Sequence, residues 1–264
     1  MIDIHHHLLY ATDDGPKDID SSVAQAEVAA ADGITHIVCT PHANDTFEFN
    51  PEKNRERLEA IQARVGNDVR LGLGCDFHLS YENIEDALKH PTKFTINQGK
   101  YLLVEFAEFM IPQSIGDTFY ELTVRGVRPI ITHPERNPIL QKEPERMIEW
   151  LRTGCLVQIT SASLGGRFGK RAQAMAWHLL ERNWVHFIAT DAHNLEGRRP
   201  SLKPAYAGVE KRFGTETAER LCVTNPRAAF DNQPLPPQPE PEGVYVYEDE
   251  PAKSKGLMAR LFGK

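Results

Sequence analysis

The amino-acid sequence predicts an α/β fold, a (β/α) barrel of about seven strands that departs from the regular eight. Strand-like and helix-like segments alternate along the chain, as in parallel βα units. Residue types that bind metals lie at the ends of most of the predicted strands. An open doubly wound sheet gathers its site at one crevice, whereas a barrel brings the carboxyl ends of all its strands to one mouth. A site that draws on six strands therefore favours the barrel.

The first segments establish the pattern. An apolar run over residues 2–9 surrounds His5, His6 and His7 and predicts a buried strand. Since strand side chains alternate in direction, His5 and His7 should share one face and His6 the other. Residues 18–32 are Ala-rich and amphipathic, which predicts a helix that ends before Gly33.

The later segments repeat the alternation. Predicted strands cover residues 34–40, 69–79, 101–106, 128–133, 156–160 and 185–190. Predicted helices cover residues 51–65, 84–90, 116–125, 144–153 and 170–182.

Composition excludes several classes of protein. Hydrophobic residues make up 41% of the 264 residues and the net charge is −7, which argues against a disordered chain and against a nucleic-acid surface. No apolar run reaches membrane-spanning length, and no basic-then-apolar signal peptide opens the chain. The cysteines are scattered without a CxxC pair, which favours reduced thiols in a cytoplasmic protein.

The character of the chain changes at Asp231. Residues 231–264 are rich in proline and glutamate, which predicts a flexible tail after a single domain over residues 1–230. The end of this tail, residues 253–264, is short, basic and amphipathic. It is interpreted either as a frayed terminus or as a segment that docks on an anionic membrane surface or a partner protein.

The strand-end residues form a candidate metal site. They are His5, His7, His42, Asp76, Glu105, His133, Asp191 and His193. Imidazole and carboxylate ligands without thiolates suit Mn²⁺, Fe²⁺, Zn²⁺ or Mg²⁺ rather than a structural zinc site. Eight ligands exceed the needs of one ion, so the sequence predicts two or three ions. Arg136 and Arg199 follow two of these strands and suggest a bidentate grip on a phosphate, with Arg198 as an alternative to Arg199.

Six motifs, taken together, resemble one known family. They are DIHHHLL…DDG, TPH, GCDFHL, YLLVEF, THPERNP and ATDAHN. In order and spacing they are similar to the PHP (polymerase and histidinol phosphatase) superfamily, and most of all to the manganese-dependent protein-tyrosine phosphatases of bacterial capsule and exopolysaccharide loci. The resemblance covers residues 1 to about 230 and implies a distorted seven-stranded barrel that holds three metal ions, most simply Mn²⁺.

The resemblance also implies roles for individual residues. The first ion would be held by His5, His7, Asp76 and Asp191. The second would be held by Asp76, Glu105 and His133, with Asp76 as the bridge, and the third by Asp14, His42 and His193. Arg136 and Arg199 would bind the phosphate. Two features depart from the family pattern: Asp76 stands where glutamate is more usual, and the residue between the first two histidines is itself His6. Asp14 is preferred over Asp13 on the resemblance alone.

The cysteines do not support the other chemistry of tyrosine phosphatases. A cysteine-based enzyme needs an arginine six positions after its nucleophile. The residues at that spacing are Asp45, Tyr81, Ser161 and Ala228. We therefore expect a metal-activated water as the nucleophile and no phosphoenzyme.

The leading functional hypothesis is hydrolysis of phosphotyrosine on the tail of a bacterial tyrosine kinase that controls polysaccharide synthesis. One alternative is a small-molecule phosphomonoesterase of the histidinol-phosphatase type. Another is a metal-dependent amidohydrolase, which also builds His-x-His barrel sites. The two arginines favour a phosphate ester over an amide.

Overall fold

The computed structural model describes residues 1–245, which form nine strands, all paired in parallel, and ten α-helices. The strands are β1 (Ile2–His6), β2 (His36–Cys39), β3 (His42–Ala43), β4 (Arg70–Leu73), β5 (Asp76–His78), β6 (Tyr101–Glu105), β7 (Arg128–Thr132), β8 (Leu156–Thr160) and β9 (Phe187–Ala189). The helices are α1 (Ile19–Ala31), α2 (Pro51–Val65), α3 (Tyr81–Lys89), α4 (Ile115–Val124), α5 (Met147–Arg152), α6 (Ser161–Leu164), α7 (Gly169–Glu181), α8 (Lys203–Phe213), α9 (Thr215–Glu219) and α10 (Asn225–Phe230). Short 3₁₀ turns η1 (Ile96–Gln98), η2 (Pro134–Arg136) and η3 (Pro144–Arg146) and a π turn η4 (Arg220–Thr224) complete the chain.

Two strand positions are interrupted in the middle. β2 and β3 are separated by Thr40 and Pro41, and β4 and β5 by Gly74 and Cys75. β2 pairs with β4 and β3 pairs with β5, so each interrupted pair follows one continuous path. The single strand predicted over residues 69–79 is therefore divided in the structure. Counted by path, residues 1–245 supply seven strand positions.

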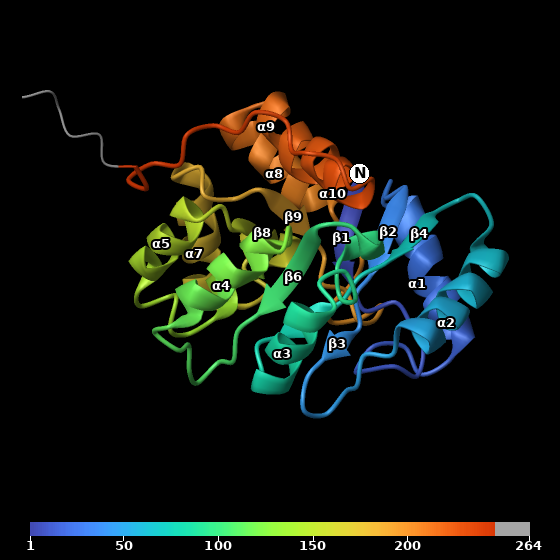
Figure 1. The fold of residues 1–264 in the computed structure, drawn as a ribbon. Coiled ribbons are helices and arrows are strands. Elements are labelled where there is room, and N and C mark those ends of the chain that lie inside the picture. The colour runs from blue at the N-terminus through green and yellow to red at the C-terminus, as the bar shows by residue number, and fades with distance from the viewer. Residues whose placement is uncertain (246–264) are drawn as a thin grey trace, which may run out of the picture.

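The strands close into a barrel. One sheet has the order β1-β2-β4 and the other β3-β5-β6-β7-β8-β9. A bridge between His6 and Ala192 joins β1 to the chain after β9, and the Asp191 amide donates to the His5 carbonyl at 2.8 Å. Helices α1 and α2 lie on one side of the strands, and α4, α5 and α7 on the other (Figure 1). The predicted α/β barrel is confirmed.

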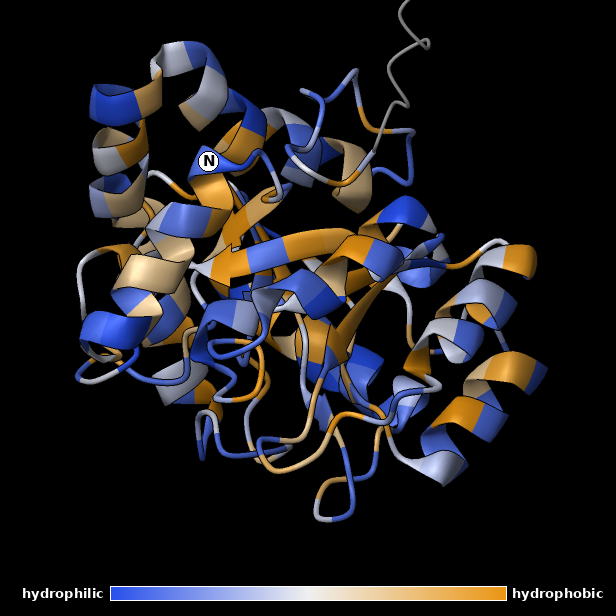
Figure 2. Cartoon of the chain, turned by 90° about the vertical axis from the view of Figure 1, so that its left-hand side faces the viewer, coloured by the Kyte–Doolittle hydropathy of each residue, from blue (hydrophilic) through white to orange (hydrophobic). Residues whose placement is uncertain are grey.

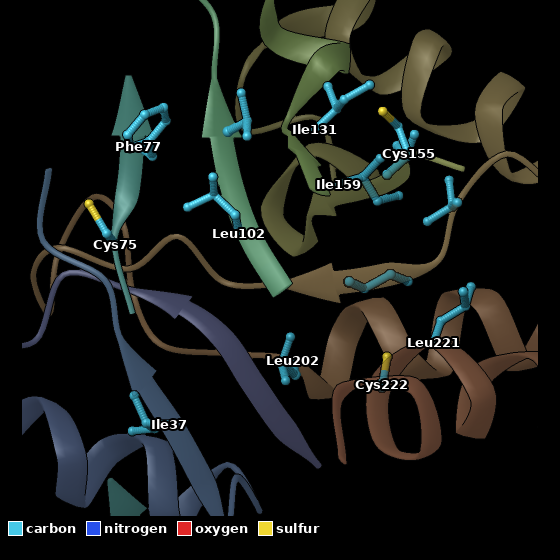
Figure 3. Close-up of a cluster of buried hydrophobic side chains, with 14 of the residues drawn as sticks. Ile37, Cys75, Phe77, Leu102, Ile131, Cys155, Ile159, Leu202, Leu221 and Cys222 are labelled. Atoms are coloured by element: carbon cyan, nitrogen blue, oxygen red, sulfur yellow. The ribbon is translucent and has the colours of Figure 1, made fainter. Parts of the chain in front are cut away.

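Side chains of alternating direction build two apolar clusters. The inner cluster joins residues from both sheets, which places it inside the barrel: Ile2, Val38, Leu103, Ile130, Leu156 and Phe187. The outer cluster packs the strands against the helices and includes Ile37, Leu102, Ile131 and Ile159 (Figure 3). The strands at the centre of the molecule are accordingly mostly apolar, whereas the surrounding helices carry many polar residues (Figure 2). This arrangement leaves the carboxyl end of the inward face for polar residues.

Local signals fix the helix ends. The predicted helix over residues 51–65 has these bounds in the structure. At its start, Asn50 caps the Lys53 amide and Pro51 opens the first turn. Asp18 caps α1 through the Ser21 amide at 2.8 Å. Gly33 follows α1 with φ of 84°, a backbone conformation that glycine adopts without a steric penalty.

Residues 231–245 contact the barrel at several points, while the flexibility of the tail stays a prediction. Val244 is fully buried, and the indole of Trp184 donates to the Glu242 carbonyl at 2.9 Å. The Tyr101 hydroxyl donates to the Gln233 carbonyl at 2.6 Å. Prolines prevent regular structure here but leave carbonyls free to accept hydrogen bonds from the barrel. The amphipathic segment 253–264 lies outside the described residues. Among the described helices, none combines the length and apolarity needed to cross a bilayer.

Replacement of Val244 by aspartate tests this packing. We expect the free energy of unfolding to fall by about 1–3 kcal/mol, because the variant must bury an unpaired charge or release the segment. A thermal midpoint lower by roughly 5 °C would follow for a chain of this size. Glu240→Ala, at an exposed position of the same segment, is the control and should leave the midpoint unchanged. Equal midpoints for Val244→Asp and the parent protein would contradict the packing.

Candidate metal centre

All nine candidate ligands lie at the carboxyl-terminal mouth of the barrel. Nitrogen and oxygen atoms approach within 4.8 Å of one another in three overlapping groups. The groups are His7, Asp14, His42 and His193; His5, His7 and Asp76; and His42, Asp76 and Glu105. The two remaining ligands adjoin them, since Asp191 Oδ1 lies 3.4 Å from His5 Nε2 and His133 Nε2 lies 3.6 Å from Glu105 Oε1.

The end of β1 positions His5 and His7 together. Their Nε2 atoms lie 3.3 Å apart, while His6 points away and its Nε2 lies 3.2 Å from Gln25 Oε1 of α1. The alternation predicted for the three histidines is therefore present. A register shift between Asp3 and His6 marks a bulge in β1. Because of the bulge, Ile4 joins the inner apolar cluster and the next residue, His5, also faces inward.

Three of the histidines are held in a fixed orientation by an oxygen atom. His5 Nδ1 lies 2.8 Å from Gln158 Oε1, and His7 Nδ1 lies 2.7 Å from Asp13 Oδ2. His193 Nδ1 lies 3.1 Å from the Asp191 carbonyl. An N–H of each ring can donate to that oxygen, which leaves Nε2 as a lone-pair donor towards the centre. This outer hydrogen bond is characteristic of histidines that bind metals.

Asp76 lies in the middle of the site. Its Oδ2 is 3.2 Å from His42 Nδ1, 3.5 Å from His5 Nε2 and 3.9 Å from His7 Nε2. The side chain is buried, and neither carboxylate oxygen has a hydrogen-bond partner among the described residues. Asp76 pairs in register with His42 on β3 and with Leu103 on β6. It is therefore placed to contact ligands from several strands.

The two neighbouring aspartates of the first loop take different positions. Asp14 Oδ1 lies 3.5 Å from His42 Nε2 and 3.2 Å from His193 Nε2. Asp13 instead contacts His7 Nδ1 and accepts a hydrogen bond from the His42 amide at 3.1 Å. Asp14 thus faces the cluster directly, and Asp13 orients two of the histidines from behind.

Two site residues adopt left-handed backbone conformations. His133 has φ of 32° and Asp191 has φ of 52°. Side chains rarely adopt such values, and positions of this kind cluster at functional sites. His133 directly follows the end of β7, and Asp191 lies two residues after the end of β9. The turn directs the side chain across the mouth, with Asp191 Oδ1 3.4 Å from His7 Nε2.

The site concentrates negative charge in a buried place. Burial and the adjacent Asp76 carboxylate raise the pKa of Glu105 to about 8. Although burial disfavours their charged forms, neighbouring carboxylates raise the pKa of His5 to about 9 and that of His42 to about 10. In the absence of metal ions, protons bound to these side chains therefore offset the negative charge of the cluster. Metal cations can take the place of these protons.

The residues fit divalent metal ions. Buried polar atoms without a partner in residues 1–245 include both oxygens of Asp76, Asp191 Oδ1, His42 Nδ1 and His193 Nε2. Such atoms cost free energy unless something binds them, and here they converge on one centre. The donors are nitrogen and oxygen only, which suits Mn²⁺, Fe²⁺, Zn²⁺ or Mg²⁺.

The arginines separate into two places. Arg136 and Arg198 each form an ion pair with Asp191 Oδ2 at the centre. Arg199, which the resemblance assigns to the phosphate, lies instead at a neighbouring pocket with Trp177 and Leu164. The structure therefore places Arg198, the alternative that the sequence leaves open, next to the candidate ligands.

A pocket of about 240 Å³ opens beside the centre. It is lined by Glu105, Phe106, Glu108, His133, Arg136, Asn137 and Phe168. The Arg136 guanidinium lies over the Phe168 ring, 4.3 Å from its centroid. An aromatic wall next to a cation and a metal centre suits a substrate that carries a ring and an anionic group.

Several supporting residues escape sequence reasoning. Gln158 is a polar residue within an apolar strand, so the sequence does contain a signal for it. Glu135 is buried and accepts from the Thr160 amide at 2.9 Å and the Ser163 hydroxyl at 2.7 Å, which fixes the turn that carries Arg136. Phe168 has no signal, because an isolated aromatic residue outside a strand resembles any loop residue.

No cysteine belongs to the three donor groups, although Cys75 directly precedes Asp76. All four are buried, and none forms a disulfide. Three of them, Cys75, Cys155 and Cys222, lie among apolar side chains (Figure 3). Burial raises the pKa of Cys155 and of Cys222 to about 12, so these thiols stay protonated at neutral pH.

Comparison with known proteins identifies similar chains. The family model described as "Capsular polysaccharide synthesis, CpsB/CapC" matches residues 1–231. The tyrosine-protein phosphatase YwqE of Bacillus subtilis is 36% identical over 246 residues, which cover 90% of this chain and 96% of that protein. The putative tyrosine-protein phosphatase CapC of Staphylococcus aureus is 34% identical over 245 residues, covering 86% of this chain and 92% of that protein.

A solved structure shares the fold closely. It belongs to a study of YwqE from Bacillus subtilis and CpsB from Streptococcus pneumoniae, described as unique metal-dependent tyrosine phosphatases. The superposition has a TM-score of 0.84 at 35% sequence identity and covers 91% of this chain and 99% of that chain.

Proposed function

Because the chain belongs to the CpsB/CapC family of capsular polysaccharide synthesis, we propose that it is a metal-dependent protein-tyrosine phosphatase. The observation that carries the proposal is the convergence of unpartnered, buried nitrogen and oxygen donors on Asp76. The resident ions are proposed to be Mn²⁺, two to three per chain. The substrate is proposed to be a phosphotyrosine protein, namely the tail of a bacterial tyrosine kinase that regulates capsule or exopolysaccharide synthesis.

The ligand assignment is the one that the family resemblance implies. It overlaps with the three donor groups, in which His42 accompanies Asp76 and Glu105. His5, His7, Asp76 and Asp191 are proposed to hold one ion, and Asp76, Glu105 and His133 a second. Asp14, His42 and His193 are proposed to hold a third. When bound, the ions supply Lewis acidity that activates water and neutralises the phosphate.

The chain's own residues bind and orient the substrate. The phosphotyrosyl ring enters the pocket against Phe168, which directs the phosphate towards the centre. Arg136 and Arg198 then exchange part of their contact with Asp191 for bidentate hydrogen bonds to phosphate oxygens. In the reaction, the bond between phosphorus and the tyrosyl oxygen breaks and a water oxygen bonds to phosphorus. One proton of the water goes to the phenolate, and the other stays with the phosphate.

The four free, buried thiols support two parts of the proposal. They suit a reducing, cytoplasmic compartment, and they are not placed to act as nucleophiles.

Inhibition distinguishes the metal mechanism from thiol chemistry. The folded protein treated with iodoacetamide should keep full turnover of p-nitrophenyl phosphate and of a phosphotyrosine peptide, because its thiols are buried and protonated. Treatment with EDTA should abolish both activities, and Mn²⁺ should restore them. Loss of activity with iodoacetamide while EDTA has no effect would overturn the mechanism.

The same assay tests the substrate class. Metal analysis after reconstitution should find two to three Mn²⁺ per chain, and a phosphotyrosine peptide should be hydrolysed faster than histidinol phosphate. A preference for histidinol phosphate would assign the protein to small-molecule phosphatases. Hydrolysis of an amide substrate alone would identify an amidohydrolase.

A further inference from the structure

A second pocket lies beside the candidate metal centre. Its volume is about 320 Å³, and its walls come from α6, the loop before α7, α7 itself, the loop 196–201 and α8. The lining is mainly apolar and includes Leu164, Trp177, Pro204 and Ala205. None of the proposed metal ligands lines this second pocket.

Two pairs of consecutive residues connect the second pocket to the centre. Phe168 lines the first pocket and packs on Arg136, whereas Arg167 before it lines the second pocket. Arg198 pairs with Asp191, whereas Arg199 after it lines the second pocket. The two pockets are therefore neighbours along one rim. An extended peptide advances about 3.3 Å per residue, so a few residues can reach from one pocket to the next.

Charge distinguishes the rim of the second pocket from the rest of the molecule. Arg167 and Arg199 are exposed, and neither has an acidic partner within 4.0 Å in residues 1–245. Glu196 is the one acidic residue in the lining, so the rim carries net positive charge on a chain whose net charge is −7. Such a rim attracts an acidic group next to the apolar interior.

We propose that the second pocket binds an apolar side chain of the phosphotyrosine substrate, next to an acidic residue that pairs with Arg167 and Arg199. The inference rests on the proposed function and adds sequence selectivity to it. Apolar burial supplies affinity, and the arginines set the direction in which the peptide lies across the rim.

Filling the second pocket tests the inference. A Cβ at Gly208 on α8 would lie 3.5 Å from the Trp177 ring, an ordinary van der Waals contact, so Gly208→Leu introduces a side chain into the lining of the pocket. Ala207→Leu adds a leucine at the exposed neighbouring position of the same helix and is the matched control. Arg167→Ala removes the rim charge, with the exposed Arg171→Ala as its control.

The substrates are two sets of phosphotyrosine peptides. In one set, a single Leu-Glu pair is moved through the positions within three residues of the phosphotyrosine. In the other set, Ala-Ala replaces this pair. The parent protein should prefer Leu-Glu in one register by about tenfold in kcat/KM, equivalent to about 1.4 kcal/mol. Gly208→Leu should lose this preference, and Arg167→Ala should lose the part that depends on glutamate. Turnover of p-nitrophenyl phosphate, which is too small to reach the second pocket, should be unchanged in all four variants.

The outcomes separate the two proposals. Equal rates on all peptides, with normal turnover of p-nitrophenyl phosphate, would overturn the second pocket and leave the proposed function standing. An equal loss on p-nitrophenyl phosphate and on peptides in both Gly208→Leu and Arg167→Ala would also overturn it. Absence of metal-dependent hydrolysis of every phosphate ester in the parent protein would overturn the proposed function itself.

Discussion

Asp76→Asn should lower kcat by about 10³-fold or more and release bound metal. Asp76 contributes to two of the three donor groups, and its Oδ2 lies within 3.9 Å of three histidines. The amide keeps the shape of the side chain but removes its charge, so two proposed ions lose a common ligand. Transition-state stabilisation by metal ions is worth several kcal/mol, and each 1.36 kcal/mol corresponds to a tenfold change in rate.

Metal analysis and phosphotyrosine-peptide kinetics on the same preparation check this expectation. Asp45→Asn, at an exposed aspartate two residues after β3, is the control and should keep both metal and activity. Circular dichroism should show that both variants are folded. A folded Asp76→Asn protein with the full complement of ions and normal kcat would remove Asp76 from the centre.

Arg136→Ala should lower kcat by about 10²–10³-fold while the metal content stays unchanged. Its guanidinium lines the pocket and contacts Asp191, but it is a donor and cannot bind a cation. Loss of one positioned donor to a developing charge has an effect of this size. His133→Ala, three residues earlier in the same turn, should lose activity together with part of its metal.

Arg136→Lys sharpens the comparison. We expect only partial recovery of kcat, because an ammonium group cannot reproduce the planar two-point contact with a phosphate. Full recovery by lysine would show that charge alone is needed at this position. Full activity in Arg136→Ala would remove the phosphate grip from the mechanism and favour the amidohydrolase alternative.

Much of the fold was accessible from the sequence because its signals are local. The alternation of apolar strands and amphipathic helices predicts the barrel, and caps such as Asn50 with Pro51 fix helix ends to the residue. The division of the strand predicted over residues 69–79 was not accessible. The break includes Gly74, where a side chain would meet Val38 at 2.9 Å, and such a contact is visible only in three dimensions.

The contacts of residues 231–245 with the barrel were also not predictable from the sequence. A segment rich in proline and glutamate has no periodicity of its own, so composition predicts that residues 231–245 do not pack. Their contacts with the barrel come from partners distant in sequence, such as Trp184 and Tyr101, which donate to their carbonyls. The buried Val244 shows that one apolar residue in a polar context can be part of a core.

For the site, the sequence by itself determined the residue types and their places at strand ends, because a strand's period and end are local properties. Only the tertiary structure decided which of two neighbours serves which purpose. Asp14 rather than Asp13 faces the cluster, and Arg198 rather than Arg199 contacts Asp191. Adjacent residues share the same local sequence, and they differ only in direction. That direction follows from the paths of the loops after β1 and β9 at the mouth of the closed barrel, which no local sequence pattern specifies.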